Sequence, residues 1–172
     1  MGEETSAKVP LLSIEPKEFW RALSQRAIGV TIVTAQNANG PAGLLALSAA
    51  HVTDNPPTML VSVDHRTSAR ITMIEAGHFA VNVLPRGSLN VANLFSGKQA
   101  VKGGDRFETG LWSAMKTGAP IFKNALAALD CVIEDMLERE TCTIFFGRVV
   151  ASTIQEENAS PLVYFRGDYL TG

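Results

Sequence analysis

The sequence predicts a mainly β protein, an antiparallel barrel or sandwich that carries a few short helices. Three observations lead to this fold class. Several segments are rich in β-branched residues or alternate apolar with polar positions, and glycine, proline or asparagine bounds each of them. The helical segments between them are short. No regular strand–helix–strand alternation is present, which disfavours a doubly wound parallel sheet.

The first residues differ in character from the rest of the chain. Residues 1–15 are polar and acidic, which predicts a flexible N-terminal arm, and residues 16–172 are then expected to form one domain. Pro16 suits a first helical turn. Apolar residues at helical spacing follow it, and we expect the helix to end at Gly29. These apolar residues are Phe19, Ala22, Leu23 and Ala27.

The next part of the chain predicts a series of strands. The β-branched stretch 29–36 is followed by a turn cluster at 37–41, so 43–53 should return as a partner strand. After the breaker 54–57, residues 58–64 form the next predicted strand.

Two short helices flank a further strand. Thr67 or Ser68 can cap a helix over 69–76 that ends at Gly77. A strand at 78–84 follows, and Ser88 can cap a second helix that ends before Gly97.

The C-terminal third combines a long loop with three more strands. Residues 97–120 are polar and glycine-rich and carry Trp112; a loop of this length is often functional. The segments 125–137, 141–153 and 161–170 each predict a strand.

The composition describes one near-neutral domain. The chain has 172 residues, a formal net charge of −2, and a charged fraction of 19%, below the ~25% typical of soluble domains, which suggests an apolar subunit interface. The charge argues against a general nucleic-acid binder. No segment reaches the ~20 apolar residues of a membrane span. Cys131 and Cys142 cannot build a disulfide framework and the N-terminus does not resemble a signal peptide, so we expect a cytoplasmic protein.

Common catalytic signatures are missing from the sequence. It has no G-x-G-x-x-G after a predicted strand, no phosphate-loop motif and no G-x-S-x-G. His51, His65 and His78 have no partner at helical spacing, so we expect no metal site. If the protein is an enzyme, a bound cofactor that carries the chemistry is the economical interpretation.

Two segments are candidate ligand sites. The run His65-Arg66-Thr67-Ser68-Ala69-Arg70 offers two hydroxyls and two arginines that could cradle a phosphate. The alternative, an ordinary helix cap with solvated arginines, is favoured by the local sequence alone. The small residues of 43–53 would let a flat ring approach the backbone near Ser48. The alternative there is a strand buried on both faces, and it too is favoured locally.

Aromatic residues gather on the last predicted strands. They could line a ring pocket, but filling the core is their more frequent role. They are Phe145, Phe146, Tyr164, Phe165 and Tyr169.

Short motifs follow one another in a specific order over residues 17–170. The N-terminal ones are F-W-R-A-L and G-V-T-I-V-T within 19–34, the glycine-led strand from Gly43 to Asn55-Pro56-Pro57, and F-A-V-N-V-L at 79–84. The later ones are N-L-F-S at 93–96, Asp105-Arg106-Phe107, Trp112, T-G-A-P-I at 117–121, L-D-C at 129–131, T-I-F-F-G-R-V-V at 143–150 and P-L-V-Y-F-R-G-D-Y at 161–169. In this order and spacing the chain resembles the flavin reductase-like family, whose fold is the FMN-binding split barrel.

The resemblance implies a fold, a reaction and partners. The fold would be an antiparallel split β-barrel that forms a homodimer, with flavin bound near the subunit interface. The reaction would be hydride transfer from NADH or NADPH to FMN or FAD, with no acid–base residue strictly required. Reduced flavin would pass to a flavin-dependent monooxygenase. The protein would supply orientation, and the cofactors would carry the redox chemistry.

The resemblance also assigns site residues. It places flavin contacts at Gly43, Leu45, Leu47, Ser48, Ser62, Val63, Asp64, Thr67, Ser68, Asn93 and Leu94. It places the nicotinamide beside Cys142, Arg166, Gly167, Asp168 and Tyr169. A phosphate role for Arg70 comes from the cradle argument instead.

Two positions depart from the family pattern. Many members have Gly-Asp-His before the T-I-F-x-G strand, whereas this chain places Cys142, a mostly neutral thiol, where the histidine would stand. Leu45 or Leu47 replaces a polar residue common in the flavin strand. These departures motivate two alternatives to an NAD(P)H:flavin oxidoreductase. One is a flavin-binding protein of the same fold that does not turn over NAD(P)H, and the other is a non-enzymatic dimer that binds another ligand.

Overall fold

A computed structural model describes residues 13–97, 101, 103–154 and 159–170 of the chain. Most of the predicted N-terminal arm, residues 1–12, therefore lies outside the described residues. The helices are α1 (Pro16–Leu23), α2 (Ala69–Ala76) and α3 (Leu89–Phe95), with 3₁₀ turns η1 (Arg86–Ser88) and η2 (Gly103–Arg106). The strands are β1 (Ile28–Gly29), β2 (Thr31–Asn37), β3 (Gly40–Ala46), β4 (Ala50–Asp54), β5 (Pro57–Asp64), β6 (His78–Val83), β7 (Trp112–Ala114), β8 (Pro120–Phe122), β9 (Ala127–Glu138), β10 (Cys142–Ile154), β11 (Val163–Phe165) and β12 (Asp168–Leu170).

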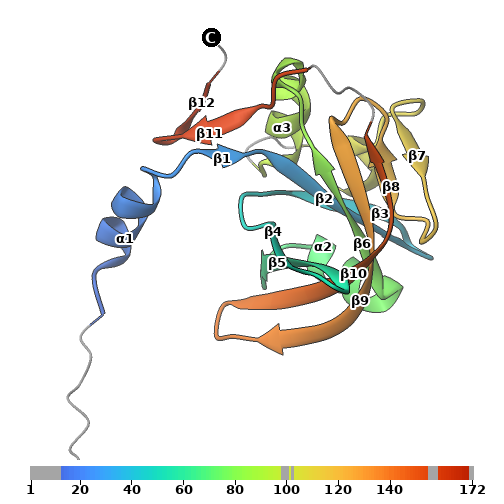
Figure 1. The fold of residues 1–172 in the computed structure, drawn as a ribbon, viewed down its shortest axis with the longest axis horizontal. Helices are drawn as coiled ribbons and strands as arrows, with labels where there is room; N and C mark the ends of the chain where they lie inside the picture. Colours follow the sequence, from blue (N-terminus) through green and yellow to red (C-terminus); the bar gives the residue numbers. More distant parts are fainter. Residues whose placement is uncertain (1–12, 98–100, 102, 155–158, 171–172) are drawn as a thin grey trace, which may run out of the picture.

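Seven of these strands form one antiparallel sheet in the order β3-β2-β6-β9-β10-β5-β4. The sheet curls so that its two ends face each other around α2 (Figure 1). At the closure, the Ser48 hydroxyl donates a hydrogen bond of 2.9 Å to the carbonyl oxygen of Ser62. Ser48 lies between β3 and β4, so this bond ties the two ends of the curled sheet together.

The interior of the barrel is a continuous apolar core. Alternating side chains of β2, β5, β6 and β10 point inward, among them Val33, Val61, Phe79 and Phe145, all with 0% exposure. Met73 on α2 joins this cluster and is likewise fully buried, so α2 fills the space inside the curled sheet.

A second core covers the outside of β2 and β6. Apolar residues of α3 and of β8 pack there, including Phe95 and Phe122. The buried Asn82 secures this layer: its amide donates to the Ile32 carbonyl at 3.2 Å, and its oxygen accepts from the Phe122 N–H at 2.8 Å. A buried polar side chain with both ends bonded fixes the position of β8 on the barrel.

A small peripheral sheet carries the two ends of the described chain. Its strand order is β1-β11-β12, and α1 projects from it beyond the barrel (Figure 1). None of the α1 residues is buried. The N- and C-terminal segments therefore meet at one edge of the molecule, away from the barrel core.

The structure corrects several predicted elements. The expected strand 43–53 is two strands, because β3 pairs with β2 whereas β4 pairs with β5 at the other end of the sheet. The expected strand 161–170 is a hairpin that turns at Arg166 and Gly167. The first helix ends at Leu23 rather than near Gly29, and the expected strand 29–36 is interrupted at Val30.

The predicted loop 97–120 and the predicted caps also need correction. The loop contains η2 and β7, and β7 pairs with β8 into a short hairpin. Ser68 and Ser88 do precede α2 and α3, but neither side chain makes a capping hydrogen bond. The spans of α2, β6 and β10 confirm the predicted elements to within a residue or so.

Candidate functional site

A cavity of about 710 Å³ lies between the peripheral sheet and the barrel. The end of β3, the loop after it, β5 and the turn before α2 form its barrel side, with Leu45, Leu47, Ser48, Ser62 and Thr67. Its volume falls in the range of small-molecule and cofactor sites.

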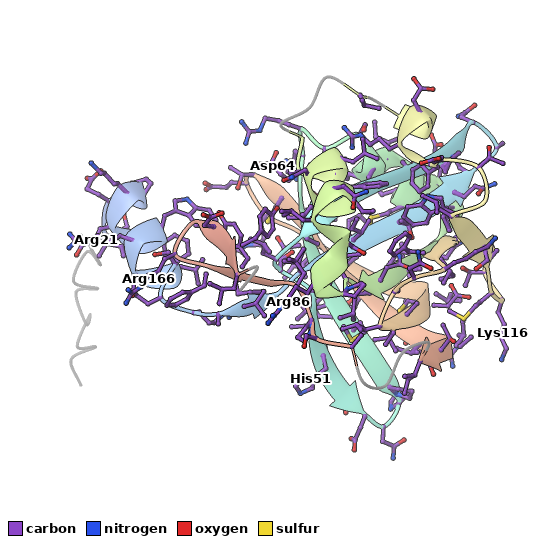
Figure 2. The ribbon with its side chains drawn as sticks, turned by 90° about the horizontal axis from the view of Figure 1, so that it is seen from above. Arg21, His51, Asp64, Arg86, Lys116 and Arg166 are labelled. Atoms are coloured by element: carbon purple, nitrogen blue, oxygen red, sulfur yellow. The ribbon has the colours of Figure 1, made fainter. Side chains whose placement is uncertain are left out.

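The peripheral side of the cavity is formed by residues near the two chain ends. Trp20 and Leu23 come from α1, Ile28 from β1 and Tyr164 from β11. Figure 2 shows Arg166 beside α1, with Arg21 farther out on the same helix. Residues more than a hundred positions apart in sequence therefore share this wall.

The hairpin turn explains how that wall is held. Arg166 and Gly167 have φ values of +51° and +92°, as expected for a two-residue turn of the primed type. The Arg166 N–H donates to the Ser24 carbonyl at 3.0 Å, and its Nε donates to Gln25 Oε1 at 2.9 Å. The turn thus holds the segment that follows α1, and the Arg166 side chain is already engaged.

Hydroxyl groups and one carboxylate supply the polar part of the cavity. Ser48 and Thr67 carry the hydroxyls, and the Ser48 oxygen keeps lone pairs free to accept a hydrogen bond from a ligand. Asp64 also lines the cavity, but Arg66 Nε and Nη2 each donate to its carboxylate at 2.9 Å. These hydrogen bonds from Arg66 hold the Asp64 pKa well below its usual range. Asp64 therefore remains ionised, with its charge offset by a neighbour.

The structure brings together part of the predicted flavin set. Seven predicted site residues line the cavity, counting the turn glycine of the nicotinamide set, and the others lie outside it. The seven are Leu45, Leu47, Ser48, Ser62, Asp64, Thr67 and Gly167.

Several residues of the predicted flavin and nicotinamide sets do not line the cavity. Leu94 and Tyr169 pack against the same apolar cluster as Leu45 and Leu47. Asn93 lies beside Leu94 on α3. Val63 is fully buried in the barrel core, and Ser68 is exposed at the start of α2.

Gly43 has a packing role in this structure. A Cβ atom built on it would lie 2.8 Å from Phe95 Cε1 and 3.1 Å from the Val33 carbonyl oxygen. The Gly43 carbonyl also accepts a hydrogen bond of 3.3 Å from Arg106 Nη1. The small residue expected to admit a flat ligand ring therefore admits the ring of Phe95.

Arg70 points to a carboxylate on the neighbouring hairpin. Its Nη2 donates to Glu138 Oε1 at 2.9 Å and its Nε to Thr143 Oγ1 at 2.6 Å. His65 Nε2 lies 3.0 Å from the other Glu138 oxygen. The Thr143 hydroxyl, followed by Arg70 and His65, lowers the Glu138 pKa. Arg70 and Glu138 thus fasten the start of α2 to the β9–β10 hairpin.

The two cysteines occupy different surroundings. Cys142 is partly exposed at the start of β10, directly opposite Asp64 in the strand register. Cys131 is buried in the barrel core, and that burial raises its pKa to about 12. Only Cys142 therefore lies next to a residue of the cavity.

Sequence reasoning missed the peripheral wall. The sequence predicted an apolar helix face of Phe19, Ala22, Leu23 and Ala27. Of these four residues, only Leu23 lines the cavity, together with Trp20 and Ser24, which the predicted face did not include. For Tyr164 the sequence left a pocket role and a core role open, and the structure shows both: Tyr164 lines the cavity and packs against the second core.

Other features of the described chain offer less for a planar ligand. A second cavity of about 720 Å³ is lined by Arg86, Ser88, Lys123, Asn124 and neighbouring small residues, without an aromatic or leucine wall. Among residues 13–97, 101, 103–154 and 159–170, no cluster of three metal-ligating side chains occurs. Within the same ranges, no helix is long and apolar enough to cross a membrane.

The cavity beside α1 fits a planar aromatic ligand that carries polar substituents. Leucine and aromatic side chains can cover the two faces of a ring, and hydroxyls at the barrel side can bond its polar edge. The fold and the site together define an antiparallel β-barrel protein with a candidate cofactor cavity at the closure of its sheet.

Comparisons with known proteins agree with this class. The model of the flavin reductase like domain matches residues 23–172, and the chain belongs to the flavin reductase-like family. The expectation of a mainly β split-barrel fold is thereby confirmed.

A curated relative and two solved structures show the extent of the similarity. The chain is 36% identical over 165 residues to the FMN reductase (NADH) RutF of Pseudomonas syringae pv. syringae, covering 96% of this chain and 91% of that protein. The NADH:FAD oxidoreductase SgcE6 of Streptomyces globisporus C-1027 superposes with a TM-score of 0.82 at 28% identity, covering 95% of this chain and 99% of that one. A homologue of nitrilotriacetate monooxygenase component B from Mycobacterium thermoresistibile gives a TM-score of 0.81 at 28% identity, covering 90% and 84%.

Proposed function

We propose that this protein is an NADH-dependent flavin reductase that transfers a hydride from NADH to FMN. One observation carries the proposal: the cavity at the barrel closure places apolar side chains and hydroxyl groups around a space large enough for a flavin ring. The relative that shares 36% identity over nearly the whole chain is named for the same reaction.

The residues present fit a flavin. Leu45, Leu47 and Tyr164 offer apolar surface for the ring faces, and Ser48 and Thr67 offer hydroxyls for its polar edge and its side chain. When bound, the flavin supplies the redox chemistry as the acceptor of the nicotinamide hydride. The chain holds the ring in place and excludes water from its covered face. Much of the rate can come from this orientation.

We assign the nicotinamide side of the site to Cys142 and to the turn formed by Arg166, Gly167 and Asp168. Gly167 lines the cavity, and Cys142 lies opposite the cavity residue Asp64 in the β5–β10 register. Tyr169 contributes its ring, which packs edge-on against Tyr164 with centroids 5.3 Å apart. Burial raises the Tyr169 pKa, so its phenol stays neutral at neutral pH.

The assembly and the partner are further parts of the proposal. Large apolar side chains remain exposed on β9 and α2 in this single chain: Ile71, Ile74, Val132, Met136 and Leu137. A homodimer would cover apolar surface of this kind. We also propose that the enzyme works in the cytoplasm, accepts FAD as well as FMN, and supplies reduced flavin to a flavin-dependent monooxygenase. A homologue of a monooxygenase component B has the same fold.

A nicotinamide oxidation assay tests the reaction. The purified protein is mixed with FMN or FAD and with NADH or NADPH, and nicotinamide absorbance is followed. We expect turnover with NADH and FMN. Flavin binding without NADH or NADPH oxidation would instead indicate a flavin-binding protein of the same fold, and absence of flavin binding would refute the proposal.

A further inference from the structure

Trp20 occupies a position that packing of the chain alone does not explain. Its side chain is 65% exposed, yet it lines the cavity from α1, and the Phe19 ring lies against it at a centroid distance of 5.4 Å. Leu23, one turn later, lines the same cavity. A tryptophan that is this exposed contributes little to the free energy of folding.

The two faces of α1 differ sharply. Glu15, Lys17, Glu18 and Arg21 border a shallow hollow on the other side of the helix. Only one face can therefore cover an apolar ligand, and that face carries Trp20 and Leu23.

The helix is also held in position. The Arg166 N–H and guanidinium bond to Ser24 and Gln25, directly after α1. Arg166 thus acts as a positioning residue for the wall that carries Trp20.

We propose that Trp20 stacks on the end of the bound flavin ring that lies toward α1, opposite Leu45 and Leu47, and leaves the hydride-accepting part of that face to the nicotinamide. This inference rests on the proposed function, because it names a further binding residue of the same site. The indole supplies a large flat surface at low entropic cost, which suits a planar heterocycle. Nothing else on the peripheral wall has a fused aromatic ring of this size among the lining residues described.

The chain offers a matched experiment because it has only two tryptophans. We would titrate the full-length wild type, Trp20→Ala, Trp20→Phe and Trp112→Phe with FMN and record the dissociation constant and the fluorescence of bound flavin. Glu18→Ala controls for changes elsewhere on α1. Sedimentation velocity checks that each variant keeps the wild-type mass.

The expected results separate contact from folding. Trp20→Ala should raise the FMN dissociation constant about 10-fold, in the range of base–aromatic stacking, and Trp20→Phe by about 3-fold or less. A stacked indole quenches flavin emission by electron transfer at contact. Bound flavin should therefore fluoresce more strongly in both Trp20 variants and be unchanged in Trp112→Phe and Glu18→Ala.

One outcome would overturn the Trp20 contact, and a different outcome would overturn the proposed reductase function. If Trp20→Ala and Trp20→Phe bind FMN as the wild type does, with unchanged flavin emission, Trp20 does not contact the flavin, whether or not NADH is oxidised. If sedimentation velocity shows that Trp20→Ala does not keep the wild-type mass, the emission of flavin bound to Trp20→Phe tests the contact instead. If the wild type fails to oxidise NADH although FMN binding depends on Trp20, the reductase proposal fails and the Trp20 contact stands.

Discussion

The two tryptophans of the chain lie in contrasting surroundings. Trp112 sits in an aromatic cluster with Phe95, Phe107 and Phe122, at ring-centroid distances of 5.7, 4.8 and 5.4 Å. Trp20 packs against the ring of Phe19 and lines a cavity of about 710 Å³. Both regions join aromatic and leucine side chains at the outside of the barrel. The cluster is filled by the chain itself, whereas the cavity has room for another molecule.

This difference separates the apolar side chains that stabilise the fold from those that are available to bind a ligand. In the filled cluster each ring packs against other rings, so truncation of one of them leaves a cavity. At the cavity the chain leaves surface uncovered, so the loss of a side chain weakens binding more than folding.

The largest expected effect lies in the filled cluster. Phe122 is 2% exposed, and Phe122→Ala should lower the free energy of unfolding by about 3–5 kcal/mol. Trp20→Ala should change it by less than about 0.5 kcal/mol. Urea denaturation of both variants measures the contrast. Equal destabilisation by the two substitutions would show that α1 is part of the folding core.

Substitution of Gly43 tests whether this residue belongs to the aromatic cluster or to the flavin site. Because a Cβ on residue 43 would lie 2.8 Å from the Phe95 ring, Gly43→Ala should lower the free energy of unfolding by about 1–3 kcal/mol. The FMN affinity of the folded protein should stay within a factor of about two. A large loss of affinity with little change in stability would instead place Gly43 in the flavin site.

Ser48 is the corresponding test on the cavity side. Its hydroxyl lines the cavity and bonds Ser62, so Ser48→Ala should weaken FMN binding by about 1 kcal/mol, roughly 5-fold. Ser68→Ala is the matched control. Its side chain is exposed and lies outside the cavity, so we expect a smaller effect. Isothermal titration with FMN compares them, and equal losses would extend the cradle to Ser68.

The smallest expected effect concerns pH. Thr143, Arg70 and His65 lower the Glu138 pKa in the folded protein, so its ionised form stabilises the fold at neutral pH. That contribution is complete above the ordinary glutamate pKa and disappears as pH falls through the lowered value. Glu138→Gln should therefore flatten the acid side of the stability profile. The urea denaturation midpoints of the wild type and of Glu138→Gln are compared between pH 6 and pH 3. Parallel profiles would show that Glu138 does not contribute to the pH dependence of stability.

The sequence was a good guide to the barrel. The alternation in 78–84 and the turn residues at 37–41 predicted strands that the structure contains, because short-range patterns determine such elements. It failed at the break between β3 and β4, since small apolar residues continue through Ser48. The pairing of β4 with β5, a long-range event, decides that break.

Half of the candidate site followed from sequence and half did not. Leu45, Ser48 and Thr67 lie near one another in the chain and could be grouped by the family resemblance. In the peripheral wall, the pairing of β1 with β11 brings Trp20 and Tyr164 to the same cavity. No short-range sequence pattern predicts a pairing between strands so far apart in the chain. The role of Arg66 beside Asp64 was likewise hidden, because the pair forms only in the folded turn.

The most direct test of this flavin site is a crystal structure of the protein with FMN. We predict that one face of the flavin ring lies against Leu45 and Leu47 on the barrel side, that Trp20 on α1 covers only one end of the other face, and that the polar edge lies near Ser48. A flavin ring bound elsewhere, with this cavity filled by the protein's own side chains, would contradict this assignment.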